Sequence, residues 1–137
     1  MDKTKLIQMA FEGMKNAYAP YSNFQVGAAL LADSGRIYTG CNIESCSYSP
    51  TSCAERTALF KAVSEGERRF LAIAIVSSGG ADGDYTAPCG VCRQMLYEFC
   101  SADMPVIMAK SIDDYKELTL GQLLPMGFGP SQLGKEL

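Results

Sequence analysis

The chain has 137 residues, 47% of them hydrophobic and 20% charged, which is the composition of a globular domain and not of a disordered segment. Its formal net charge of −3 argues against a protein that binds along nucleic acid, since such a protein needs a basic face. Histidine is absent, which excludes Ser-His and Cys-His nucleophile pairs and every zinc site that uses imidazole.

The first elements expected along the chain are a helix and a hairpin. Apolar residues recur with helical spacing from Lys3 to about Tyr18, and Pro20 ends this helix. Phe24 to Leu31 and Arg36 to Ile43 are typical of two strands. They flank the turn Asp33-Ser34-Gly35, in which the glycine supplies a positive φ.

The rest of the chain alternates helices with buried strands. A helix is expected from about Ser52 to Glu65, opened by a capping box that pairs Thr51-Ser52 with Glu55. The continuous apolar run from Phe70 to Val76 predicts a strand buried on both faces. The remaining expected elements are a helix from Gly90 to about Cys100, a strand from Val106 to Ala109, and a strand and short helix within Leu118 to Leu124.

Helices that alternate with buried strands predict an α/β fold, here a three-layer α/β/α sandwich with a central mixed sheet of about five strands. A chain of this length is expected to form a single domain, residues 1–137. The segment from Gly79 to Asp84 is expected to be flexible, and the order of the tail after Pro130 is left open.

The N-terminal segment shows no signal-peptide pattern, because Gln8, Glu12 and Lys15 interrupt its apolar residues. No stretch approaches the roughly 18–20 apolar residues of a membrane span. We therefore expect a cytoplasmic protein with no membrane partner. In that compartment cysteines bind metal or carry out chemistry more often than they form disulfides.

Three of the six cysteines stand at expected helix starts. Cys89 and Cys92 form a C-x-x-C pair, which suits either metal chelation or dithiol redox chemistry. Cys53 begins the earlier helix, and helix N-termini favour thiolates over thiols. Three thiolates could hold one zinc ion with its fourth position open, as catalytic zinc sites do.

Glu55 follows Cys53 by two residues, in the first turn of the same helix. There its carboxylate could take a proton from a water molecule on the metal without binding the metal itself. Other interpretations are buried thiols without metal, a Glu55 that only caps the helix, and a structural zinc site with a fourth cysteine. The candidates for that fourth ligand, which we otherwise assign to packing, are Cys41, Cys46 and Cys100.

The motifs C-A-E and P-C-x-x-C resemble those of the zinc-dependent nucleoside and nucleobase deaminases. Within that class the chain is similar to the short, homotetrameric cytidine deaminases, through the segments YSNFQVGAAL, GRIYTGCNIES, TSCAERTAL, APCGVCRQ and LLPMGF. The resemblance implies one Zn²⁺ per subunit on Cys53, Cys89 and Cys92, with Glu55 as the catalytic proton shuttle. It implies hydrolysis of cytidine and 2′-deoxycytidine to uridine and 2′-deoxyuridine plus ammonia, by a zinc-activated hydroxide, in pyrimidine salvage.

The resemblance also implies a set of substrate-binding residues: Phe24, Asn42, Glu44, Tyr48, Ala54 and Phe128. Phe24 would contact the pyrimidine face, while Asn42 and Glu44 would hold the ribose 3′-hydroxyl. Tyr48 and Phe128 would reach the site from a neighbouring subunit, so the homotetramer would share its active sites. Simpler interpretations are a core aromatic for Phe24, a turn residue for Asn42, a surface charge for Glu44 and a loosely packed tail aromatic for Phe128.

Three thiolates on one zinc ion leave an excess negative charge, which weakens the pull of the metal on its water. Arg56 could offset this charge by hydrogen bonding to a thiolate, although an arginine at such a position is also commonly a solvated helix charge. Two other functions remain as alternatives. One is a sister deaminase that acts on another aminated heterocycle, and the other is a zinc-bound or thiol-redox module without hydrolytic activity.

Overall fold

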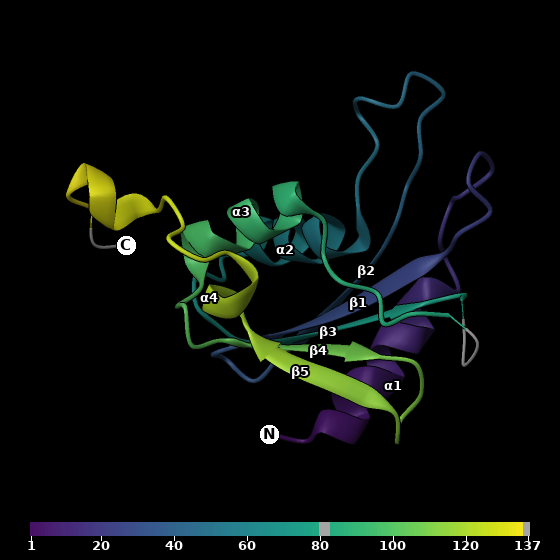
Figure 1. The fold of residues 1–137 in the computed structure, drawn as a ribbon, viewed down its shortest axis with the longest axis horizontal. Helices are drawn as coiled ribbons and strands as arrows, with labels where there is room; N and C mark the ends of the chain where they lie inside the picture. Colours follow the sequence, from purple (N-terminus) through teal and green to yellow (C-terminus); the bar gives the residue numbers. More distant parts are fainter. Residues whose placement is uncertain (80–82, 136–137) are drawn as a thin grey trace.

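The computed structural model describes residues 1–79 and 83–135 (Figure 1). Residues 80–82 of the segment expected to be flexible lie outside the described residues. The elements are α1 Lys3–Met14, β1 Val26–Ala32, β2 Ile37–Cys41, α2 Ala54–Ser64, β3 Phe70–Ser77, α3 Gly90–Phe99, β4 Pro105–Ala109, β5 Tyr115–Thr119, α4 Leu120–Leu123 and a 3₁₀ helix Pro130–Leu133. In the described ranges, no helix has the length and apolar character needed to cross a membrane.

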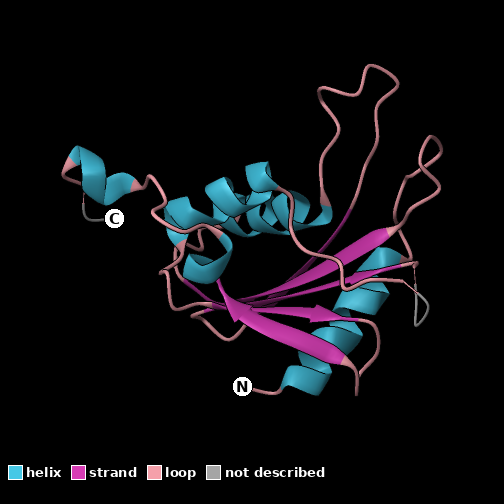
Figure 2. Ribbon diagram, viewed as in Figure 1, coloured by secondary structure: helices cyan, strands magenta, loops and turns pink. Residues whose placement is uncertain are grey.

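The five strands form one sheet in the order β2-β1-β3-β4-β5. Strands β3 and β4 are parallel, and the other neighbours are antiparallel. Helix α1 covers one face of the sheet, while α2 and α3 lie side by side over the other (Figures 1 and 2). The predicted three-layer sandwich with a mixed five-stranded sheet is confirmed.

Strand β3 is buried on both faces, which explains why its sequence is apolar without alternation. Its residues Ile73 and Ile75 belong to the core beneath α2 and α3, and Ala72 and Ala74 belong to the core against α1. Successive side chains of a strand point to opposite faces, and both faces here are buried. The small alanines on one side let α1 pack close to the sheet.

A close contact between β2 and α2 fixes where the second helix begins. A Cβ atom on Gly40 would lie 2.4 Å from the carbonyl oxygen of Ala54 and 2.5 Å from the amide nitrogen of Ala58. Only glycine allows the two backbones to approach this closely. The start of α2 is therefore held against the end of β2.

One predicted helix end and one predicted helix start were wrong, each because of backbone pairing with a residue outside the helix. Helix α1 ends at Met14 instead of about Tyr18, because Tyr18 pairs with the chain after β2 through its backbone bonds to Asn42 and Glu44. The predicted capping box is absent from the start of α2. Ser52 exchanges two 2.9 Å backbone hydrogen bonds with Ile43 and is thus extended, so the helix begins two residues later, at Ala54.

The other differences are smaller. Strand β1 begins at Val26, two residues after the predicted start, and β5 begins at Tyr115, three residues before the predicted one. Strand β5 lies at the sheet edge and its first residues are exposed, so its sequence lacks the apolar signal of a buried strand. In the tail, Pro130–Leu133 form a 3₁₀ helix.

Two connections extend from one end of the sheet, the α1–β1 loop at residues 15–25 and the β2–α2 loop at residues 42–53 (Figure 1). They are joined by the backbone bonds of Tyr18 and by bonds from Tyr21 and Ser22 to the Glu44 carboxylate. The C-terminal segment extends in the opposite direction (Figure 1). This pair of loops forms one wall of the candidate site.

Candidate metal centre and active-site cleft

Helix α3 carries two of the three predicted metal ligands. Cys89 is the N-cap residue, and its Sγ atom accepts a hydrogen bond of 3.5 Å from the backbone N–H of Cys92. Cys92 is buried in the first turn. A sulfur thus occupies the place where helices usually have a serine or aspartate oxygen, so the local helix geometry itself holds the C-x-x-C pair together.

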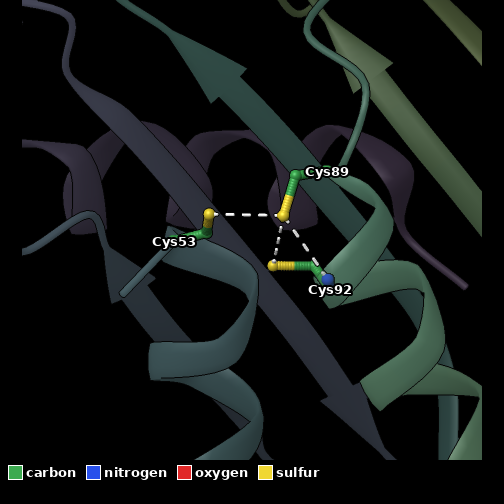
Figure 3. Close-up of side chains that lie close together, drawn as sticks. All are labelled: Cys53, Cys89 and Cys92. Atoms are coloured by element: carbon green, nitrogen blue, oxygen red, sulfur yellow. Dashed lines mark hydrogen bonds between the residues drawn. The ribbon is translucent and has the colours of Figure 1, made fainter. Parts of the chain in front are cut away.

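Helix α2 supplies the third ligand from the same structural position. Cys53 is the N-cap of α2, and in the described part of the chain it makes no side-chain cap bond. Its Sγ atom lies 3.5 Å from that of Cys89, which in turn lies 3.5 Å from that of Cys92 (Figure 3). The side chains of the three residues point toward one another from the two helix starts (Figure 3).

This arrangement fits a zinc ion. All three sulfur atoms lie within 4.8 Å of one another. Tetrahedral Zn–S bonds of about 2.3 Å place two sulfur atoms about 3.8 Å apart. Among the described residues, Cys53, Cys89 and Cys92 form the one group of this kind, and Cys41, Cys46 and Cys100 lie outside it. The arrangement therefore favours an open, three-ligand site over a four-cysteine structural site.

The cysteines assigned to packing divide into two kinds. Cys41 and Cys100 are buried, and burial raises the pKa of the Cys100 thiol to about 12, as expected of an inert core cysteine. The packing assignment of Cys46 is wrong, because this residue is exposed in the β2–α2 loop. That loop extends away from the sheet and offers no core to fill.

Arg56 faces the metal centre from the first turn of α2. Its Nη2 atom donates to the carbonyl oxygen of Thr51 at 3.2 Å and to Sγ of Cys53 at 3.7 Å. Hydrogen bonds from Cys92 and then Arg56 lower the pKa of Cys53 to about 5. The same shared proton, together with burial, raises the pKa of Cys92. Cys53 is thus the metal ligand that Arg56 supports directly.

Glu55 is only 3% exposed. Burial, and then the charge on Cys53, raises its pKa to about 7. A carboxyl group with such a pKa can gain and lose a proton near neutral pH, which is what a general acid-base catalyst requires. Among the described residues, no capping box engages Glu55 at the start of α2.

A cleft of about 330 Å³ leads to this centre from the end of the sheet that carries the two joined loops. It brings together seven residues predicted from the sequence: Phe24, Asn42, Glu44, Cys53, Ala54, Glu55 and Cys89. It also includes six that were not predicted as site residues: Ser22, Val26, Thr51, Ser52, Thr86 and Ala87. Ser52 and Ala87 directly precede a predicted site residue or the P-C-x-x-C motif, the other four lie two residues from one, and that proximity was the signal available to find them.

Three predicted substrate-binding residues have defined places in this cleft. Phe24 is 43% exposed and lies before β1, so it is not a core aromatic. Asn42 is buried; its Oδ1 atom accepts from Val26 N at 2.9 Å and its Nδ2 atom donates to Phe24 O at 2.8 Å. The Glu44 carboxylate accepts from the backbone N–H groups of Tyr21 and Ser22 at 3.0 and 3.1 Å, and these bonds and that of the Ser22 hydroxyl lower its pKa.

The two residues assigned to a neighbouring subunit do not line this cleft in their own chain. Tyr48 is 72% exposed, has a φ of +62°, and stacks edge to face on Tyr21 at 6.3 Å between ring centroids. Phe128 is 57% exposed and lies on the C-terminal segment. A larger hollow of about 550 Å³, between that segment and the end of α3, holds none of the predicted site residues.

Comparison with known proteins agrees with this geometry. The family model for the cytidine and deoxycytidylate deaminase zinc-binding region matches residues 1–108. The cytidine deaminase of Sporosarcina psychrophila is 50% identical over 133 residues, covering 97% of this chain and 96% of that protein. The cytidine deaminase of Halalkalibacterium halodurans is 48% identical over 128 residues, covering 93% and 95%.

Solved structures give the same result. The crystal structure of cytidine deaminase from Burkholderia pseudomallei superposes with a TM-score of 0.86 at 43% identity, covering 93% of this chain and 100% of that one. For the enzyme from Mycobacterium tuberculosis the TM-score is 0.81 at 40% identity, with 94% and 98% covered. The chain therefore belongs to the cytidine and deoxycytidylate deaminase family, and Cys53, Cys89 and Cys92 form its zinc-binding site.

Proposed function

We propose that this protein hydrolyses cytidine and 2′-deoxycytidine to uridine and 2′-deoxyuridine, with release of ammonia. The observation that carries the proposal is the convergence of three thiol sulfurs beside the buried Glu55 at the base of a 330 Å³ cleft. The proposed substrate is a nucleoside, in agreement with the cytidine deaminases that this chain is similar to.

Zinc held by the three cysteines would supply the Lewis acidity that makes a water molecule nucleophilic at neutral pH. Glu55 would accept one proton from that water and deliver it to the ring nitrogen N3. It would then take the second proton, from the hydroxyl group added to C4, and pass it to the departing amine. One carboxyl group can do all of this, because a pKa of about 7 lets it act as base and then as acid. Arg56 would reduce the excess negative charge of the thiolates through its bond to Cys53.

Asn42 and Glu44 would bind the ribose 3′-hydroxyl as donor and acceptor. The second N–H of Asn42 Nδ2 is not needed for its bond to Phe24 O, and the carboxylate of Glu44 is already oriented by two backbone N–H groups. Phe24 would lie against the pyrimidine, and Ala54 would contact the substrate from the start of α2. Both residues line the cleft.

We further propose a cytoplasmic homotetramer in which Tyr48 and Phe128 complete the active site of a neighbouring subunit. Both side chains are largely exposed in the single chain, and neither lines the cleft there. The positive φ of Tyr48 supports a specific role, since a bulky residue seldom adopts that conformation without one. Sedimentation velocity would test the assembly directly.

The activity is tested by loading the purified protein with stoichiometric zinc and following the ultraviolet absorbance of cytidine and 2′-deoxycytidine. We expect conversion of both nucleosides. Glu55→Gln has nearly the same shape, so it should keep zinc while losing about 10²- to 10⁴-fold in kcat. A zinc-loaded wild-type protein inert on both nucleosides would refute the proposal, as would a fully active Glu55→Gln.

A second measurement separates a nucleoside deaminase from one that acts on a free base. Removing the substrate 3′-hydroxyl should cost the wild type about 10-fold or more in kcat/KM, the value of a hydrogen bond to a charged group. Glu44→Gln should show a smaller difference between cytidine and 3′-deoxycytidine. Equal rates on cytosine and cytidine would instead favour the free base.

A further inference from the structure

Arg93 makes two hydrogen bonds, one just before the zinc ligands of α3 and the other at the end of α4. It follows Cys92 on α3 and is half-buried. Its Nε atom donates to the carbonyl oxygen of Pro88 at 2.7 Å, and its Nη1 atom donates to that of Leu123 at 2.8 Å. One guanidinium group therefore joins the residue before the N-cap of α3 to the end of α4.

The bond to Pro88 acts on the metal ligand itself. The carbonyl of Pro88 belongs to the same planar peptide group as the nitrogen of Cys89, so fixing that oxygen fixes the plane from which the Cys89 side chain departs. Pro88 is fully buried and precedes the helix, where no backbone N–H of α3 is placed to bond its carbonyl in the regular helical pattern. Arg93 satisfies that oxygen with a charged donor, which is the stronger kind of hydrogen bond.

The bond to Leu123 ties this peptide to the C-terminal segment, residues 123–129. Leu123 is the last residue of α4, where helix carbonyls lack an internal partner. The next residue on α3 holds the same segment, since Gln94 Nε2 donates to Phe128 O at 2.8 Å. The ring of Tyr97 packs beneath it so closely that a Cβ atom on Gly129 would lie 2.8 Å from ring atom Cε2.

We infer that Arg93 is a positioning residue for the zinc centre: it orients the Cys89 thiol through the Pro88 peptide and couples that orientation to the C-terminal segment. This inference rests on the proposed function for its metal. Among the described residues, Arg93 does not hydrogen bond to the sulfur atoms and does not line the cleft. Arg56, in contrast, donates directly to Cys53 Sγ.

The test compares Arg93→Ala and Arg93→Lys with Arg68→Ala in the zinc-loaded protein. Arg68 is a matched control, because its Nη1 atom also donates to two backbone carbonyls, of Val63 and Glu67, each at 2.8 Å, at the far end of α2. Lysine keeps the positive charge of Arg93 but lacks the planar fork that spans two carbonyls. The first readout is zinc release to a chromogenic chelator, and the second is the absorption spectrum of the cobalt-substituted protein.

We expect both Arg93 variants to bind zinc about 10-fold more weakly, the usual loss when a residue behind a metal ligand is removed. Their cobalt spectra should shift, while Arg68→Ala should match the wild type in both readouts. If Arg93→Ala does not fold, Arg93→Lys decides alone. Wild-type zinc release and an unshifted cobalt spectrum in folded Arg93→Lys would overturn the inference. Failure of the proposed function would appear elsewhere, as a wild-type protein without zinc or without turnover.

Discussion

The two halves of the zinc site are built differently, although each begins with a cysteine at a helix N-cap. In the α3 half, Cys89 and Cys92 are three residues apart, and the sulfur of the first accepts the N–H of the second. In the α2 half, Cys53 has no such local bond among the described residues. Its place is set by the pairing of Ile43 with Ser52 and by the close approach at Gly40. One half is thus organised by its own sequence, and the other by tertiary contacts.

The two arginines differ in the opposite sense, because Arg56 bonds nearby residues and Arg93 reaches a residue 30 positions away. Arg56 bonds the Cys53 sulfur itself and the carbonyl of Thr51, so it compensates charge as well as holding the chain. Arg93 bonds only carbonyls, those of Pro88 and Leu123. The direct electrostatic support of the α2 half therefore comes from its own first helical turn. The α2 half also carries Glu55, so the proton carrier is positioned by the tertiary fold.

The largest effect is expected from removing a thiol from either half. An apparent zinc-binding free energy of about 10–16 kcal/mol, shared among the ligands, makes each worth about 3–5 kcal/mol. Cys53→Ser and Cys92→Ser should therefore weaken zinc binding about 10²- to 10⁴-fold and abolish turnover of cytidine. Competition with a chromogenic chelator measures the affinity. Tight zinc binding by Cys53→Ser would show that the α2 half is dispensable.

Two glycine substitutions test whether only the α2 half depends on tertiary contacts. In Gly40→Ala the new Cβ would meet backbone atoms of Ala54 and Ala58 at 2.4 and 2.5 Å, and the strain should lower the unfolding free energy by about 1–3 kcal/mol or more. Gly90 lies between the two ligands of α3, and a Cβ there would meet no described atom within 4 Å. Gly90→Ala should be neutral or slightly stabilising in urea denaturation. Equal losses would contradict the comparison.

Arg56→Ala tests the electrostatic support of the α2 half. Because the thiolate charge is no longer compensated, kcat should fall about 10- to 100-fold while zinc is largely retained, since one charged hydrogen bond is worth about 1.5–3 kcal/mol. Steady-state kinetics and zinc content of the same preparation give both quantities. Unchanged turnover in a zinc-replete variant would remove this role from Arg56.

The smallest effect is expected beyond the far end of α2, at Glu67. Hydrogen bonds from Ser34 and then Tyr38 hold the pKa of this carboxyl below its usual value. A pKa lowered by folding stabilises the protein above the pKa of the unfolded chain, and that stabilisation is lost as the pH falls through the folded pKa. Glu67→Gln should therefore be slightly less stable than the wild type at pH 7 and equal to it in acid. Thermal melts across pH would show this.

The kcat of Glu67→Gln is the control for the stability measurement. Helix α2 has 11 residues, so about 16 Å separate Glu67 from the zinc centre at the other end. Glu67→Gln should keep the wild-type kcat at pH 7. A large loss of turnover would mean that the two ends of α2 are coupled.

The sequence predicted the α3 half-site and its helix well, because the C-x-x-C spacing and the helix start are local. It also predicted β3, whose apolar run reflects burial on both faces. It was wrong about the capping box at Ser52 and about the end of α1, since both depend on backbone pairing with residues outside the helix, Ser52 with Ile43 and Tyr18 with Asn42. The role of Arg93 was missed for the same reason: its partner Leu123 lies 30 residues away.

The absence of histidine and the placing of cysteines at two helix starts determined what kind of metal site this protein could have: thiolates with a carboxylate beside them. Spacing along one helix turn is enough to specify such neighbours. Only the tertiary structure decided that the three sulfur atoms meet within 4.8 Å, that Cys46 stays outside, and that Glu55 is buried. These facts depend on how α2 packs on β2 and beside α3. That packing is set by long-range contacts that no local pattern contains.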